Sequence, residues 1–176
     1  MVDFSNELLA IAKNLNRNHF KVILAKNSED AKRCALDFIP PNSSIGIANS
    51  VTVRQVGVIE ALRERGDHLV DPISLIHGSS SEFSQEVFMG LMRKSLETDV
   101  FLSGTNAITQ DGKLVNIDGL GNRVAGIIWA KGKVLIPIQS LPVISLQTLN
   151  TLWPNISLRP RYIPPERKLR RFAVIG

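Results

Sequence analysis

The chain has 176 residues, of which 44% are hydrophobic and 21% are charged. This length and composition predict one folded domain and exclude a largely disordered chain. Cys34 is the one cysteine, which excludes an intrachain disulfide and a cysteine-based metal cluster. The apolar runs are shorter than the ~20 residues that a membrane-spanning helix needs, and the N-terminus lacks a signal-peptide pattern, so we expect a cytoplasmic protein without a membrane span.

The net charge of +5 is unevenly distributed along the chain. Residues 1–118 carry 12 basic and 15 acidic side chains, whereas residues 119–176 carry 9 basic side chains and the single acid Glu166. This asymmetry indicates either a basic arm for nucleic acid or an anionic ligand, or an end of the chain that differs in kind from the rest.

The first 71 residues predict three helices that alternate with three strands. Apolar residues at helical spacing predict helices that Ser5, Ser28 and Thr52 would cap, over residues 5–18, 28–38 and 52–66. Short β-rich runs predict strands over residues 20–25, 44–48 and 68–71.

The next part of the chain continues the alternation and adds a hairpin. Residues 81–97 and 124–129 predict helices, and residues 99–103 and 133–138 predict strands. Asp111-Gly112 between two β-prone runs predicts a tight hairpin near residues 106–117. The whole pattern predicts an α/β fold with a mostly parallel sheet flanked by helices, and with this hairpin as an insertion.

The pattern changes after residue 138. Six of the nine prolines lie at or after Pro137, and residues 159–171 hold six Arg or Lys. We assign no element there. The expected organisation is one domain over residues 1–138 followed by an atypical basic, proline-rich segment over residues 139–176.

Two stretches could form a ligand site. In the first, the predicted strand 44–48 runs through small polar residues into a helix, which places backbone N–H groups at the strand-end cleft, where they suit an anion. Its candidate residues are Gly46, Asn49, Ser50 and Thr52. The alternative is that Ser50 or Thr52 only caps the helix.

The second stretch crowds glycines and polar side chains beside two predicted strands. Its candidate residues are Thr105, Asn106, Asp118, Gly119, Gly121, Asn122 and Arg123. Arg123 offers a planar fork for phosphate or carboxylate, and Asp118 could orient Arg123 or act as a base. The glycines lack the full dinucleotide fingerprint, and His19, His68 and His77 share no metal-ligand spacing.

Residues 99–125 closely resemble the signature of the lactate-utilisation (LUD) domain family, in particular its LutC/YkgG-like proteins. Residues 44–52 and the helix over 59–66 resemble the family's first signature and the helix that follows it. The order and spacing of these motifs also match, so that the resemblance covers roughly residues 5–138.

The resemblance implies a NagB/RpiA/CoA-transferase-like fold, whose members handle sugar phosphates, coenzyme A esters or folates at the strand-end cleft. It also implies a link to bacterial L-lactate oxidation beside iron–sulfur oxidoreductase partners. The matching positions are Gly46, Ser50, Thr52, Thr105, Asn106, Asp111, Gly112, Asn116, Asp118, Gly119, Gly121, Asn122 and Arg123. Of these, Asp111 and Gly112 are expected to fix the hairpin, and Asn49 stands where the family often has glycine.

The chain departs from the family after the last predicted strand. Many relatives continue with a helix and a basic segment that bears cysteine, whereas this chain shows no such helix pattern and no cysteine after Cys34. We therefore hypothesise that residues from about 139 arise from a truncated or out-of-frame end, with a genuine basic arm as the rival explanation. Resequencing the gene tests this: an intact single frame with the same tail in an independent isolate would reject the hypothesis.

Three functions compete. The first is a LUD protein of lactate or organic-acid utilisation, an enzyme subunit or an accessory factor, that binds a small anion in the cleft. The second is a sugar-phosphate, acyl-CoA or folate-type enzyme of the same fold group, with Asp118 as its base. The third, nucleic-acid binding through the basic tail, is disfavoured because no recognition module is visible. A homo-oligomer is an open alternative, and the residues indicate no particular cofactor.

Overall fold

The computed structural model describes residues 4–77, 84–138, 143–144 and 171–175. Their strands form a six-stranded sheet, in which all neighbours are parallel in the order β1-β9-β7-β4-β2-β3, and a small three-stranded sheet in the order β6-β5-β8. The strands of the large sheet are β1 (Lys21–Leu24), β2 (Ser44–Ile47), β3 (His68–Val70), β4 (Val100–Leu102), β7 (Lys133–Ile138) and β9 (Arg171–Ile175). Those of the small sheet are β5 (Ala107–Thr109), β6 (Leu114–Val115) and β8 (Val143–Ile144).

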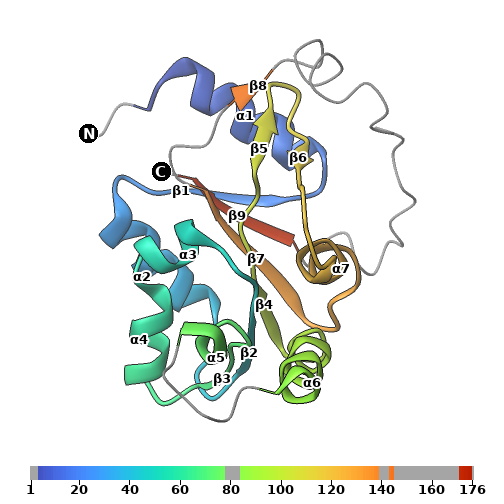
Figure 1. Ribbon diagram of the computed structural model, residues 1–176. Helices are drawn as coiled ribbons and strands as arrows, with labels where there is room; N and C mark the ends of the chain where they lie inside the picture. The colour runs from blue at the N-terminus through green and yellow to red at the C-terminus, as the bar shows by residue number, and fades with distance from the viewer. Residues whose placement is uncertain (1–3, 78–83, 139–142, 145–170, 176) are drawn as a thin grey trace.

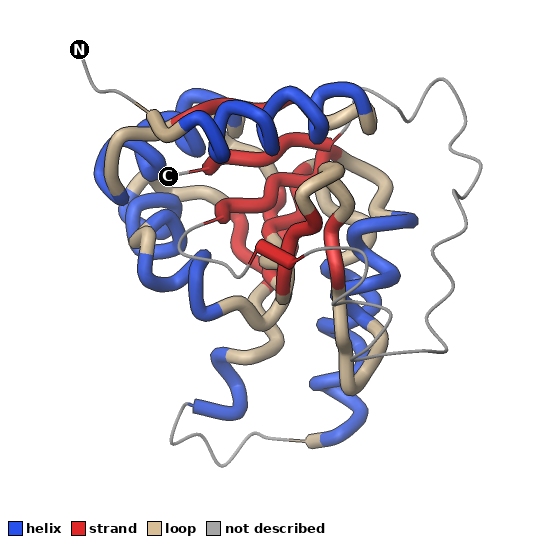
Figure 2. The backbone as a smooth tube through the Cα atoms, turned by 90° about the horizontal axis from the view of Figure 1, so that it is seen from above, coloured by secondary structure: helices blue, strands red, loops and turns tan. Residues whose placement is uncertain are grey.

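Helices cover both faces of the large sheet (Figures 1 and 2). They are α1 (Asn6–Arg17), α2 (Ser28–Phe38), α3 (Val51–Gln55), α4 (Val58–Glu64), α5 (Ser74–His77), α6 (Gln85–Ser95) and α7 (Asn122–Trp129). In Figure 1, α2 and α4 lie on one side of the strands and α6 and α7 on the other. This arrangement confirms the predicted α/β fold with a parallel sheet flanked by helices.

Each face of the sheet has its own apolar core. Residues of α2, α3 and α4 pack on one face, where Ile59 and Leu62 are fully buried. Residues of α1, α7 and the hairpin pack on the other face, where Leu15 and Phe101 are fully buried. The alternating apolar positions in the sequence therefore build two layers of helix around one sheet.

The helix starts differ from the predictions at two places. The side chain of Asn27, rather than Ser28, accepts the Asp30 N–H at 2.8 Å and caps α2. The predicted helix over 52–66 is two helices, because Gly57 adopts a left-handed φ of 74° between α3 and α4. Ser50, rather than Thr52, caps the first of them, as its Oγ accepts the Val53 N–H at 3.3 Å. The apolar periodicity runs on through this break, so it did not predict the left-handed backbone conformation, which glycine adopts readily.

The end of the chain contributes a central strand that the sequence did not predict. β9 lies between β1 and β7 and pairs with both, with Phe172 opposite Lys21 on one side and opposite Leu135 on the other. The sheet therefore continues beyond the predicted domain boundary at residue 138, because residues 171–175 add a strand to it. Most of the basic segment, residues 145–170, lies outside the described residues.

Candidate functional site

The loops that follow β2 and β4 meet at the carboxyl edge of the large sheet. Ser50 begins α3 after β2, and Gly104 follows β4; both are buried. A Cβ on Gly104 would lie 2.3 Å from Ser50 Oγ, so the two loops touch where only glycine fits. Because Ser50 Oγ also caps α3, Ser50 fixes the junction of the loops, which is the simpler of its two predicted roles.

Arg123 joins both loops to the first turn of α7. Its Nη1 donates to Asn106 Oδ1 at 2.9 Å, and its Nη2 donates to the Asn49 carbonyl at 3.2 Å. We call Asn49, Asn106 and Arg123 the arginine clamp. The structure thus brings together three of the predicted site residues, one from each of three separate segments.

Arg123 of the clamp has unused hydrogen-bond donors. A guanidinium has five N–H groups, and the two bonds above leave Nε and one N–H on each terminal nitrogen. The Nε is buried and has no hydrogen-bond partner among the described residues. Buried donors of this kind are rare in folded proteins and mark sites where water or a ligand completes the bonding.

Asn106 is oriented so that its amide nitrogen adds to these donors. Its Oδ1 accepts from both Ile117 N at 2.9 Å and Arg123 Nη1. Both hydrogen bonds of Oδ1 are therefore made within the protein, whereas Nδ2 makes no hydrogen bond in the described part of the chain. Since Asn106 is exposed, the two N–H groups of Nδ2 are available as donors to solvent or a ligand.

Asp118 binds backbone rather than Arg123. Its Oδ2 accepts the Val124 N–H at 3.1 Å, and its Oδ1 accepts the Leu120 N–H at 3.4 Å. No ion pair joins Asp118 to Arg123 within the described residues. The carboxylate therefore orients Arg123 indirectly, by capping the helix that carries it.

The glycines around α7 have different reasons to be glycine. Gly121 adopts a left-handed φ of 79° immediately before α7, which favours glycine there. A Cβ on Gly119 would meet nothing within 4 Å. Gly126, within α7, lies against the ring of Phe101, where a Cβ would come within 2.0 Å of a ring carbon. This close approach of α7 to β4 is what places Arg123 over the strand ends.

Several predicted residues have structural roles or lie away from the clamp. Gly46 is buried inside β2, where a Cβ would lie 2.1 Å from the Ser95 carbonyl oxygen. The buried Thr105 donates from Oγ1 to the Val115 carbonyl at 2.9 Å and ties its loop to β6. Thr52 and Asn122 lie half-buried in the first turns of α3 and α7.

Asp111 and Gly112 fix the hairpin, as expected. Gly112 has a φ of 78°, and a Cβ there would lie 2.5 Å from the Asn14 backbone of α1. Asn18 Nδ2 donates to the Gly112 carbonyl at 2.7 Å. Burial raises the pKa of Asp111, but hydrogen bonds from Lys113 and Thr109 outweigh it and hold the pKa below its ordinary value.

Sequence reasoning did not single out the apolar side chains that accompany the clamp. Val51, Ile117 and Leu120 are 69%, 48% and 66% exposed, and they lie on the segments that carry the clamp's hydrogen bonds. Asn116, beside Ile117, has a buried Oδ1 with no partner in the described ranges.

Comparison with protein-family models identifies residues 8–137 as a LUD domain. The chain belongs to the LUD domain family. The matched range contains every residue of the arginine clamp and ends within β7, before β9. The family designation relates the LUD domain to lactate utilisation. No curated protein and no solved structure matches the chain.

The described residues hold neither a metal-ligand cluster nor a membrane-spanning helix. Across residues 4–77 and 84–138 and the described strands β8 and β9, no group of His, Cys, Asp and Glu is arranged to hold a metal ion. The helices that the structure describes include none with the length and apolar character to cross a bilayer.

Proposed function

We propose that this LUD protein is LutC/YkgG-like and acts in the utilisation of L-lactate or a related organic acid, with the arginine clamp as the site that binds a small anion. The family match supports the metabolic context. The clamp supports the chemistry, because the unused side-chain groups of Arg123 and Asn106 are hydrogen-bond donors.

The orphaned Nε of Arg123 is the observation that carries the proposal. A carboxylate or phosphate has only acceptors, so one oxygen can take the Nε–H and a second oxygen the adjacent Nη–H in a bidentate pair. Asn106 Nδ2 offers further N–H groups at the same place. Lactate, pyruvate and a phosphate ester each supply two acceptor oxygens for this pattern, whereas a neutral amide supplies one uncharged acceptor oxygen and a cation such as ammonium supplies none.

Exposed apolar side chains, those of Val51, Ile117 and Leu120, accompany the polar groups of the clamp. Charge-assisted hydrogen bonds strengthen where apolar side chains reduce the local dielectric. These apolar side chains suit contact with the carbon skeleton of an organic acid. They also suit contact with the iron–sulfur oxidoreductase partner that the resemblance implies.

Titration calorimetry with L-lactate, pyruvate, ribose 5-phosphate and acetyl-CoA tests the site and distinguishes the metabolic alternatives. We expect at least one of these anions to bind, and Arg123→Gln to weaken its binding by about tenfold to a hundredfold, because a charge-assisted bidentate contact is lost. The control is Arg63→Gln on the exposed face of α4, which removes the same charge away from the clamp.

Two results would contradict the proposal. One is the absence of binding for every anion of the panel to folded protein. The other is equal binding by Arg123→Gln and Arg63→Gln. A panel in which ribose 5-phosphate or acetyl-CoA binds and lactate and pyruvate do not would favour the enzyme alternative, for which Asp118 is the candidate base.

A further inference from the structure

Asn116 carries an unsatisfied acceptor close to the arginine clamp. Its Oδ1 is buried and has no hydrogen-bond partner among the described residues. The residue is half-buried and follows β6, at the open end of the hairpin. A buried carbonyl oxygen without a partner has lost its hydrogen bonds to bulk water, so it marks a place where a ligand or an ordered water completes the bonding.

Backbone hydrogen bonds on both sides of Asn116 fix its place next to Asn106. The Val115 carbonyl, which precedes Asn116, accepts the Asn106 N–H at 2.9 Å. The Ile117 N–H, which follows Asn116, donates to Asn106 Oδ1 at 2.9 Å. Because both groups are bonded to one residue, Asn116 is held between them beside Asn106.

Arg123 reaches the same junction. Its Nη1 donates at 2.9 Å to the Asn106 Oδ1 that also accepts the Ile117 N–H. The guanidinium and the peptide group that joins Asn116 to Ile117 therefore meet at one oxygen atom. Two of the buried side-chain atoms without a partner, Arg123 Nε and Asn116 Oδ1, thus belong to residues of one small region.

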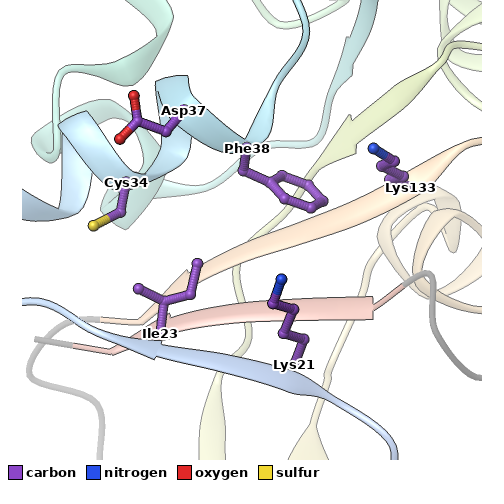
Figure 3. A pocket seen from close by; sticks show the side chains of 6 residues that line it. All are labelled: Lys21, Ile23, Cys34, Asp37, Phe38 and Lys133. Atoms are coloured by element: carbon purple, nitrogen blue, oxygen red, sulfur yellow. The ribbon is translucent and has the colours of Figure 1, made fainter.

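The hollow that Figure 3 shows shares no residue with this region. It is lined by residues of α2, β1 and β7, namely Lys21, Ile23, Cys34, Asp37, Phe38 and Lys133. Asn49, Asn106 and Asn116 instead follow β2, β4 and β6, and Arg123 lies in α7. Groups that discriminate between anions at the clamp are therefore to be found beside Arg123 itself.

Arg123 Nε and Asn116 Oδ1 are opposite in kind. The first is a donor and the second an acceptor, and since each is without a partner they do not bond each other. One ligand completes both if it carries an acceptor and a donor on neighbouring atoms. A 2-hydroxycarboxylate does so, because its carboxylate accepts from a guanidinium and its hydroxyl donates to an amide oxygen. A 2-ketocarboxylate carries acceptors only, and an unsubstituted carboxylate has no polar group at carbon 2.

We propose that Asn116 determines the specificity of the arginine clamp and selects 2-hydroxycarboxylates over 2-ketocarboxylates and unsubstituted carboxylates. This inference rests on the proposed function, since it takes the clamp as the site that binds the anion. Arg123 binds the carboxylate, and Asn116 Oδ1 accepts the hydroxyl of the ligand. A keto oxygen in the place of the hydroxyl would set two acceptors against each other and leave Oδ1 unpaired.

Three acids with the same carbon skeleton test the selection. L-Lactate, pyruvate and propionate differ only at carbon 2, and their affinities are measured by titration of the folded full-length protein. We expect L-lactate to bind about three- to tenfold more tightly than propionate, the difference that one net hydrogen bond makes. Pyruvate should bind no more tightly than propionate.

Variants separate the selection from the binding of the anion. Asn116→Ala should lower the affinity for L-lactate to that for propionate and leave the affinity for propionate unchanged. Arg123→Gln should weaken the binding of all three acids. Asn6→Ala, at an exposed position of α1 outside the clamp, is the matched control and should retain the preference for L-lactate. Circular dichroism verifies that each variant is folded, and the preference of the parent protein is measured without any variant.

The outcomes distinguish this inference from the proposed function. Equal affinities of the parent for L-lactate and propionate, with both weakened in Arg123→Gln, would overturn the role of Asn116 and leave the clamp as an anion site. Tighter binding of pyruvate than of L-lactate would overturn that role too, as would a preference for L-lactate that persists in Asn116→Ala. If none of the three acids bound, the selection would be refuted, and the calorimetry with ribose 5-phosphate and acetyl-CoA would decide whether the clamp binds anions at all.

Discussion

Asn106 and Arg123 of the arginine clamp flank the hairpin in the sequence, yet the hydrogen bonds of the hairpin's polar groups are made within the protein and those of the clamp are left incomplete. In the hairpin, the Asp111 carboxylate accepts from Thr109 and Lys113, and α1 closes the turn through Asn14 and Asn18. In the clamp, Arg123 Nε is buried without a partner in the described residues, and Asn106 turns its N–H groups outward. The satisfied polar groups of the hairpin fit a fold-fixing role, and the unsatisfied Nε of Arg123 is a place where water or a ligand can complete the hydrogen bonding.

Substitution at the hairpin turn should produce the largest change in stability. Gly112→Ala forces a left-handed φ on alanine and sets its Cβ against the α1 backbone, so we expect a loss of about 2–4 kcal/mol in the free energy of unfolding. Urea unfolding measures it. Gly119→Ala is the matched control in the clamp segment, where a Cβ meets nothing and the loss should stay below about 0.5 kcal/mol. Equal losses in the two variants would remove the distinction between the segments.

Asp118 should give an intermediate effect. Asp118→Ala removes the cap of α7 and should cost about 1 kcal/mol, while Asp118→Asn retains an acceptor oxygen and should cost less. Thermal unfolding measures both, and anion binding at the clamp should weaken in the same order. If Asp118→Asn instead abolished a turnover while stability and KM stayed unchanged, Asp118 would be the base that the enzyme alternative requires.

The smallest effect concerns pH. The pKa of Asp111 is lowered in the folded protein, so its ionised form adds stability above the ordinary pKa of about 3.9 and loses it as pH falls through the folded value. The side chain is 41% exposed, and solvent screening reduces the contribution to about 0.5 kcal/mol. Asp111→Asn should therefore be less stable than the parent at pH 7, and the difference should shrink as the pH falls through the lowered pKa of Asp111. A difference that persists in acid would show that the hairpin does not depend on this charge.

The sequence predicted the alternation of strands and helices and the hairpin because both follow from local patterns of apolar and turn residues. It placed Asn49, Asn106 and Arg123 among the candidate site residues. It did not predict the hydrogen bonds between them, because these depend on how three loops meet. The indirect role of Asp118 depends on the direction of backbone N–H groups at the start of α7, which residue types do not reveal.

β9 was missed for a different reason. Residues 171–175 follow a long basic, proline-rich stretch, and five residues between two neighbours in a parallel sheet show no alternation to detect. Its pairing with both β1 and β7 is a non-local property.

The Nε–H of Arg123 gives the most direct test of the claim that the clamp binds an anion. Its resonance in the nitrogen–proton spectrum of labelled protein can be assigned as the arginine Nε signal that disappears in Arg123→Gln. We predict that titration with the anion found by calorimetry shifts this resonance saturably, with the same affinity as the calorimetric curve. A saturating anion that leaves the Arg123 Nε–H resonance in place would contradict the account, because the orphaned donor would then have no part in binding.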